Sequence, residues 1–104
     1  MTEELINKFA KLVKGKNDNK DILIFTLSTC LWCKKCKSYL NERDVQYRYI
    51  DVDQIPYDQK ATIMNYLSNK YDTRVSYPFL ICDGEIAVGY DPYKYDQMIN
   101  TGGN

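Results

Sequence analysis

Hydrophobic residues recur along the chain with two spacings, one typical of helices and the other of strands. Apolar residues every three or four positions predict helices over residues 2–14, 34–43 and 54–71, and a last helix that follows Asp91. Short apolar runs and alternating patterns predict strands over residues 21–28, 45–52, 79–82 and 85–88. Asp83-Gly84 stands between the last two strands and is typical of a two-residue hairpin turn.

This order of elements predicts an α/β fold. The strand–helix–strand unit over residues 21–52 is expected to be right-handed with parallel strands, whereas the last two strands form an antiparallel hairpin. We therefore expect a mixed four-stranded sheet with helices on both faces. The 104 residues suit a single domain over residues 1–104, with an N-terminal helix within residues 1–15 and a disordered tail at residues 101–104.

Composition excludes several classes of function. Fourteen basic and fourteen acidic residues balance, which removes the electrostatic case for nucleic acid or an anionic membrane as the main partner. The absence of histidine excludes catalysis by histidine and metal ligation by histidine. The longest apolar run, residues 22–25, is too short to span a bilayer. Because residues 1–4 lack the features of a signal peptide, we expect a cytoplasmic protein, and we expect it to be a monomer.

Three of the four cysteines lie within seven residues, a pattern that indicates redox chemistry or metal binding in a reducing compartment. Cys30 stands where a buried strand ends and a helix begins, so backbone N–H groups and the helix dipole would stabilise its thiolate. Lys34, Lys35 and Lys37 add positive charge nearby. Cys30 is therefore the candidate nucleophile, and Cys33, one turn later, can resolve a mixed disulfide formed on it.

Three motifs together resemble the glutaredoxin family: Cys30-Leu31-Trp32-Cys33, Ser76-Tyr77-Pro78 and Gly89-Tyr90-Asp91. The resemblance implies a thioredoxin-like three-layer fold, a cis peptide bond before Pro78, and an enzyme that acts as a dithiol–disulfide oxidoreductase on protein or small-molecule disulfides. It also implies that the backbone of Tyr77 pairs with substrate and that Gly89, Tyr90 and Asp91 can receive the glutamyl end of glutathione. No bound cofactor is implied. Electrons would come from glutathione, another low-molecular-weight thiol or a flavoprotein reductase.

Three positions depart from the family pattern. Leu31-Trp32 replaces the common Pro-Tyr pair, and Leu27 stands where many glutaredoxins carry a lysine that pairs with a glutathione carboxylate. The segment that ends in Pro92 also resembles the glutaredoxin-like electron donors of ribonucleotide reductase, which lack a preference for glutathione. We therefore expect poor use of glutathione.

Other interpretations of the same residues remain open. Cys30 and Cys33 could belong to a metal or iron–sulfur carrier, although position 40, where a ferredoxin-type run needs its fourth cysteine, is a leucine. Cys36 and Cys82 are expected to be buried packing residues. We expect Trp32 to be half exposed beside the thiols as a platform for substrate, and Asp91 to act at least as a helix N-cap.

Overall fold

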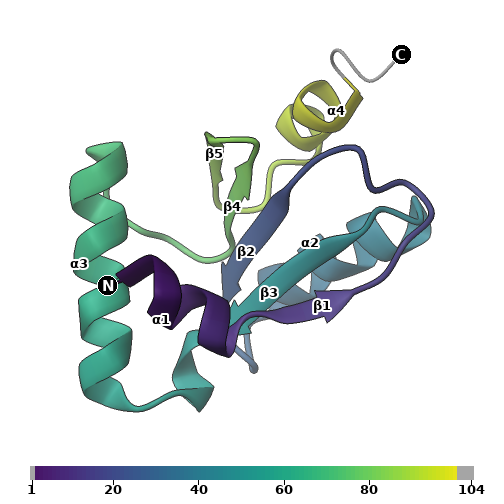
Figure 1. Cartoon of the computed structure of the whole chain (residues 1–104). Coiled ribbons are helices and arrows are strands. Elements are labelled where there is room, and N and C mark those ends of the chain that lie inside the picture. The colour runs from purple at the N-terminus through teal and green to yellow at the C-terminus, as the bar shows by residue number, and fades with distance from the viewer. Residues whose placement is uncertain (1, 101–104) are drawn as a thin grey trace.

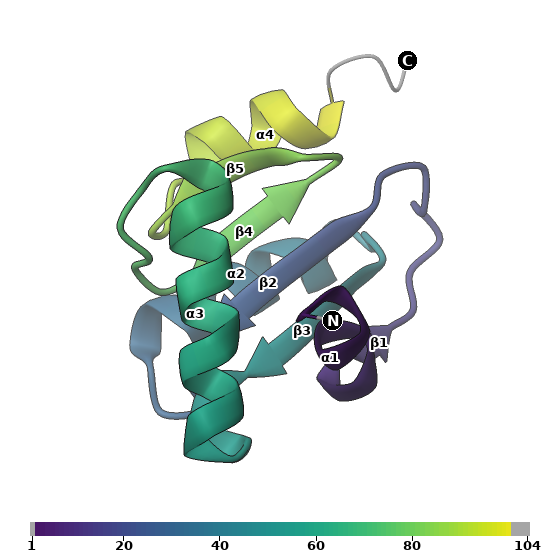
Figure 2. The ribbon, with the colours of Figure 1, turned by 60° about the vertical axis from the view of Figure 1, so that its left-hand side comes forward.

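The computed structural model describes residues 2–100, in which a mixed five-stranded sheet separates two layers of helices (Figures 1 and 2). The strand order is β1-β3-β2-β4-β5; β2 and β3 run parallel, and the other neighbours are antiparallel. In chain order the elements are α1 (Thr2–Phe9), β1 (Lys11–Val13), β2 (Ile22–Thr26), α2 (Leu31–Glu42), β3 (Tyr47–Asp51), the 3-10 turn η1 (Val52–Gln54), α3 (Tyr57–Tyr71), β4 (Phe79–Cys82), β5 (Glu85–Val88) and α4 (Pro92–Asn100).

The core lies on both faces of the sheet, which explains why β2 is a continuous apolar run rather than an alternating strand. Ile24 packs with residues of α2 and α4 on one face. Phe25, the next residue, packs with residues of α1 and α3 on the other face. Successive side chains of a strand point to opposite faces, so both residues can be buried only because helices cover both faces of the sheet.

The predicted helix over residues 2–14 is wrong in its second half. Helix α1 ends at Phe9, and residues 11–13 form β1, which pairs antiparallel with β3. This fifth strand was not expected, because the apolar spacing of residues 5–13 fits a helix and the pairing partner lies more than thirty residues away. Gly15 explains the path of the chain after β1: a Cβ atom there would lie 2.6 Å from the Asp44 carbonyl oxygen.

Three further boundaries differ from prediction. Helix α2 begins at Leu31 rather than at position 34, because Cys30 caps it. Residues 52–54 form η1, so α3 begins only at Tyr57, with Pro56 just before it. Strand β3 is shorter than residues 45–52, and Val45 forms only an isolated bridge with Asn17.

The predicted strand pairing and the predicted hairpin turn are confirmed. Strands β2 and β3 are parallel, and β4 and β5 form an antiparallel hairpin. The turn residues Asp83 and Gly84 both have positive φ, at 49° and 89°, as a two-residue hairpin turn of this type requires. The predicted tail at residues 101–104 lies outside the described residues. No helix within residues 2–100 is both long enough and apolar enough to cross a membrane.

Candidate active site

The two cysteines of the motif lie at the N-terminus of α2, directly after β2. Cys30 is the N-cap residue, with extended backbone angles, and its Sγ accepts a hydrogen bond from the backbone N–H of Cys33 at 3.3 Å. Its carbonyl oxygen accepts from the N–H of Lys34 at 3.1 Å, and its own N–H donates to the Leu27 carbonyl oxygen at 3.2 Å. A sulfur in the N-cap position occupies the place where a helix stabilises negative charge.

The two sulfurs have different environments. Cys30 is partly exposed, whereas Cys33 is only 1% exposed. Burial raises the pKa of Cys33 to about 12, and a hydrogen bond with the Cys30 side chain contributes in the same direction. Cys30 can therefore be reached by a substrate, while Cys33 keeps its proton beneath it.

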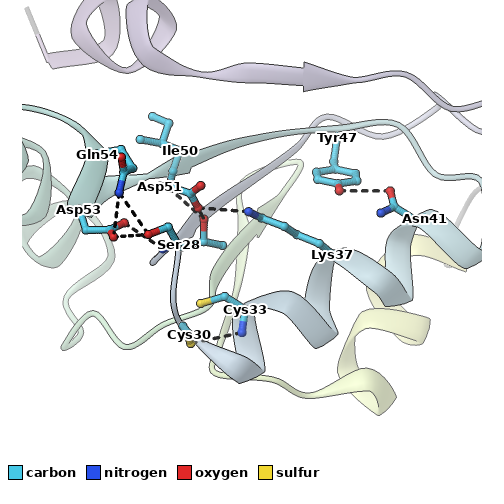
Figure 3. Close-up of polar contacts among 11 residues, drawn as sticks. Ser28, Cys30, Cys33, Lys37, Asn41, Tyr47, Ile50, Asp51, Asp53 and Gln54 are labelled. Carbon is cyan, nitrogen blue, oxygen red and sulfur yellow. Dashed lines mark hydrogen bonds and ion pairs between the residues drawn. The ribbon is translucent and has the colours of Figure 1, made fainter.

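The loop that delivers Cys30 is held by Asp53 of η1 (Figure 3). The Asp53 carboxylate accepts hydrogen bonds from the backbone N–H of Ser28, at 2.9 Å, and from the Ser28 hydroxyl. These bonds lower the pKa of Asp53. Gln54 adds bonds from its side-chain amide to the Ser28 hydroxyl oxygen and to the carboxylate. Sequence analysis missed this anchor, because Ser28 and Asp53 are distant in the chain.

The segment before β4 carries the second motif of the predicted site, Ser76-Tyr77-Pro78. The Tyr77–Pro78 peptide bond is cis, as the resemblance implied. The Pro78 carbonyl oxygen accepts a hydrogen bond from the N–H of Gly89 at 2.8 Å, which ties this segment to the start of the next predicted motif. Burial raises the pKa of Tyr77, with smaller contributions from Cys33 and Asp53, and its hydroxyl contacts the Met64 sulfur at 2.9 Å.

An aromatic pair borders the site where α2 meets the segment before α4. Trp32 is 52% exposed, as expected, and its ring stacks on Tyr90 with 5.8 Å between centroids and 27° between planes. The Nζ of Lys35 lies 5.0 Å from the centroid of the Trp32 ring. The Tyr95 hydroxyl donates to the Gly89 carbonyl oxygen at 2.8 Å, which fixes the backbone below Tyr90.

Gly89 and Asp91 have clear local roles. Gly89 has a φ of 79°, a conformation that other residues rarely adopt. Asp91 caps α4 as predicted, and its Oδ1 accepts a hydrogen bond from the N–H of Lys94 at 3.1 Å. The structure therefore brings the N-terminus of α4 to the same end of the sheet as Cys30.

One expected contribution to the site is wrong. Lys37 does not add charge beside Cys30, because its Nζ forms an ion pair with Asp51 at 3.1 Å (Figure 3). The same Nζ lies 4.1 Å from the ring centroid of Tyr49. Asp51 also accepts a hydrogen bond from the buried hydroxyl of Thr26. This cluster joins α2 to the C-terminal ends of β2 and β3, and sequence analysis did not find it.

The two other cysteines are buried, as predicted. Cys36 is 0% exposed and Cys82 is 2% exposed, and burial raises the pKa of each thiol to about 11. Within residues 2–100, no three cysteine, aspartate or glutamate side chains lie close enough together to hold a metal ion.

Comparison with known proteins identifies the family. The family model for glutaredoxin matches residues 22–87, which include both motif cysteines and the cis-proline segment. The chain belongs to the glutaredoxin family. An uncharacterised glutaredoxin-like protein of 8.6 kDa from the rubredoxin operon of Clostridium pasteurianum is 31% identical over 78 residues, which make up 75% of this chain and 96% of the relative.

Solved glutaredoxin structures share the fold. The glutaredoxin from Methanosarcina mazei Go1 is 26% identical, with a TM-score of 0.73 over 86% of each chain. Methanoredoxin from Methanosarcina acetivorans is 27% identical, with a TM-score of 0.67 over 79% of this chain and 86% of its own. The buckwheat glutaredoxin–glutathione complex, at 16% identity and a TM-score of 0.64, supports the fold alone. Family and fold support a function of the thiol–disulfide oxidoreductase type.

At Leu27 the candidate site of this chain departs from the pattern of many glutaredoxins. The Leu27 side chain packs against the apolar cluster beneath α1 and α3. The next residue, Ser28, is bonded to the carboxylate of Asp53. The position where many glutaredoxins place a cation is therefore apolar here, and an anion stands beside it.

Proposed function

We propose that this protein reduces disulfides of proteins and small molecules through Cys30 and Cys33. The Cys30 thiolate attacks one sulfur of the substrate disulfide, forms a mixed disulfide and releases the first substrate thiolate. The Cys33 sulfur then gives up its proton to solvent or to that thiolate and attacks Cys30 Sγ. This second exchange releases the other substrate thiolate and leaves a Cys30–Cys33 disulfide, so two electrons have passed to the substrate.

The observation that carries this proposal is that the thiols of Cys30 and Cys33 differ in hydrogen bonding and in exposure to solvent. Cys30 Sγ accepts a backbone hydrogen bond at the N-cap of α2 and is partly exposed, whereas Cys33 is buried and its pKa is raised to about 12. A nucleophile must be accessible and favoured as a thiolate. A resolving thiol should stay protonated until an intermediate forms. The N-cap position and partial exposure of Cys30, together with the burial of Cys33, support these two roles in the order expected from the sequence.

Residues around the thiols are assigned to substrate binding in this proposal. An extended substrate chain would pair with the backbone of Tyr77, held by Pro78, and rest against Trp32. Gly89, Tyr90 and Asp91 would border its other side. Support comes from the hydrogen bond that joins Pro78 to Gly89 and from the stacking of Trp32 on Tyr90.

The proposal extends to the electron donor. A thiol other than glutathione, or a flavoprotein reductase, would reduce the Cys30–Cys33 disulfide in the cytoplasm. The apolar Leu27 and the anionic Asp53 beside Ser28 support this choice, because glutathione carries two carboxylates that need cations.

Reduction assays on substituted proteins test the function. Cys30→Ser should abolish turnover with a neutral small disulfide and with a disulfide-bonded protein, whereas Cys33→Ser should accumulate a mixed disulfide visible by mass spectrometry. Cys36→Ala is the matched control and should keep its activity. The native protein should turn over faster with thioredoxin reductase than with glutathione and glutathione reductase. Activity of Cys30→Ser equal to that of the native protein would refute the proposal, and a visible cluster band in protein purified without oxygen would favour a carrier.

A further inference from the structure

A groove of about 540 Å³ begins beside the reactive thiol and runs between α2 and the start of α4. Leu31, which directly follows Cys30, lines one end of it, and Tyr90, the stacking partner of Trp32, lines the side formed by the segment before α4. A polypeptide whose disulfide lies at Cys30 would therefore meet this groove within a few residues of its own cysteine.

The groove has an excess of positive charge. Lys34, Lys35 and Arg43 line it, and Glu42 is the acidic residue among its lining side chains. Arg43 is already engaged, because it lies 3.6 Å from an Asp96 oxygen and its guanidinium lies 3.6 Å from the Tyr39 ring centroid.

The two lysines on the first turns of α2 are available to a partner. Within residues 2–100, neither Lys34 nor Lys35 has a carboxylate within 4.0 Å, whereas Lys37 on the same helix is paired with Asp51 and faces away. Lys35 is held above the Trp32 ring by a cation–π contact, which leaves its ammonium beside the groove. The helix has no acidic residue in its first turn.

Exposed apolar side chains accompany these charges. Leu31 is 61% exposed and Trp32 is 52% exposed, both directly beside Cys30. Large apolar side chains that are exposed together next to a reactive group mark a surface for a partner. Phosphate-rich partners such as nucleic acid would use the lysines but leave the leucine uncovered, so the combination favours a polypeptide that carries both carboxylates and an apolar side chain.

We propose that this groove docks an acidic segment, with one apolar side chain, of the proteins whose disulfides Cys30 attacks. The carboxylates pair with Lys34 and Lys35, and the apolar side chain covers Leu31 and the edge of Tyr90. This inference rests on the proposed function for the nature of the partner. Charge complementarity of this kind raises the rate of encounter and selects among partners.

Binding without chemistry tests the groove separately from the redox function. Trp32 is the chain's single tryptophan, so its fluorescence reports on this end of the groove. Peptides without cysteine that carry one leucine and four aspartates, four serines or four lysines should bind in that order of affinity, with aspartate at least about tenfold tighter than lysine at low salt. The difference should shrink in 0.5 M salt.

Charge reversal tests whether Lys34 and Lys35 bind the carboxylates of the peptide. Lys34→Glu/Lys35→Glu should reverse the order of the peptides, whereas Lys11→Glu/Lys14→Glu, which makes the same change in net charge on the exposed residues of β1 and the loop after it, should preserve it. Equal affinity for acidic and basic peptides, or an order that the first double variant leaves unchanged, would overturn the proposal.

Reduction of matched peptides then connects docking to turnover. The same three sequences with a disulfide should be reduced with kcat/KM values in the same order. For each protein these values are divided by its kcat/KM for a neutral small disulfide, which removes any effect of Lys34 and Lys35 on the reactivity of Cys30. If no disulfide is reduced but the acidic peptide still binds through the lysines, the proposed function is refuted and the docking proposal is supported. If the small disulfide is reduced but peptide charge has no effect on binding or on kcat/KM, the docking proposal is refuted and the proposed function is supported.

Discussion

The Sγ atom of Cys30 lies 3.3 Å from the backbone nitrogen of Cys33 and accepts its hydrogen bond. This contact places one sulfur at the positive end of α2 and leaves the other beneath it, 1% exposed. Two cysteines separated by two residues thus occupy positions that differ in access to solvent and in electrostatics. The first two predictions follow from this difference.

Alkylation of the native protein should modify Cys30 alone. The reduced protein, treated with a small excess of iodoacetamide at neutral pH, should carry a single adduct by mass spectrometry, because the other three thiols are at most 2% exposed and their pKa values are raised. The same treatment in denaturant should give four adducts. Rapid addition of a second adduct under native conditions would contradict the structure.

Alkaline pH should destabilise the reduced protein. Burial raises the pKa of Cys36 from 9.0 to about 11, so the folded protein keeps this proton where the unfolded chain has lost it. The stabilisation is therefore fully present below pH 9 and is lost as the pH rises from 9 towards 11. Each such thiol contributes a slope of up to about 1.4 kcal/mol per pH unit.

Urea unfolding of the reduced protein between pH 8 and pH 10 measures this slope. Cys36→Ala should show a shallower decline than the native protein, since one of the buried thiols is gone. Identical slopes for the two proteins would mean that the Cys36 thiol titrates alike in the folded and unfolded chains.

Removal of the Asp53 carboxylate should loosen the loop that positions Cys30. Asp53→Ala should lower the free energy of unfolding at pH 7 by about 1 kcal/mol or less, because solvent screens an exposed carboxylate, and should lower turnover several-fold. The pKa of Asp53 is lowered in the folded state, so this stabilisation is present above its ordinary value of 3.8 and is lost as the pH falls below it.

Paired unfolding measurements at pH 7 and at pH 2.5 check the origin of this effect. The gap between the native protein and Asp53→Ala should narrow at the acidic pH, and Asp53→Asn, which keeps an acceptor without the charge, should lie between them. If the difference in the free energy of unfolding is unchanged at pH 2.5, the destabilisation comes from lost packing and not from the charge.

Introduction of a cation at position 27 should improve the use of glutathione. Leu27→Lys restores a charge-assisted hydrogen bond to a glutathione carboxylate, a bond that contributes roughly 1.5–3 kcal/mol, or one to two decades in affinity. The apparent Michaelis constant for glutathione should fall accordingly in steady-state turnover. Leu27→Met controls for the loss of leucine packing. If the native protein already matches the lysine variant, Leu27 does not limit glutathione.

Local sequence was sufficient wherever a few neighbouring residues decide the structure. The apolar run of residues 22–25 predicted a buried strand, Asp83 and Gly84 predicted their hairpin turn, and Asp91 predicted its own helix cap. The motif of Cys30 and Cys33 indicated the position and order of the thiols for the same reason, since an N-cap and the residue three positions later are coupled by helix geometry itself.

Tertiary structure alone decided the features that depend on distant partners. Residues 11–13 have a helical spacing but form β1, because the open edge of β3 offers backbone hydrogen bonds that outweigh a weak local preference. Lys37 turns away from the thiols because Asp51 lies beside it, and Ser28 is held because Asp53 reaches it across the ends of β2 and β3. The sequence by itself determined which residues are candidates for the chemistry, and long-range contacts decided which charges surround them.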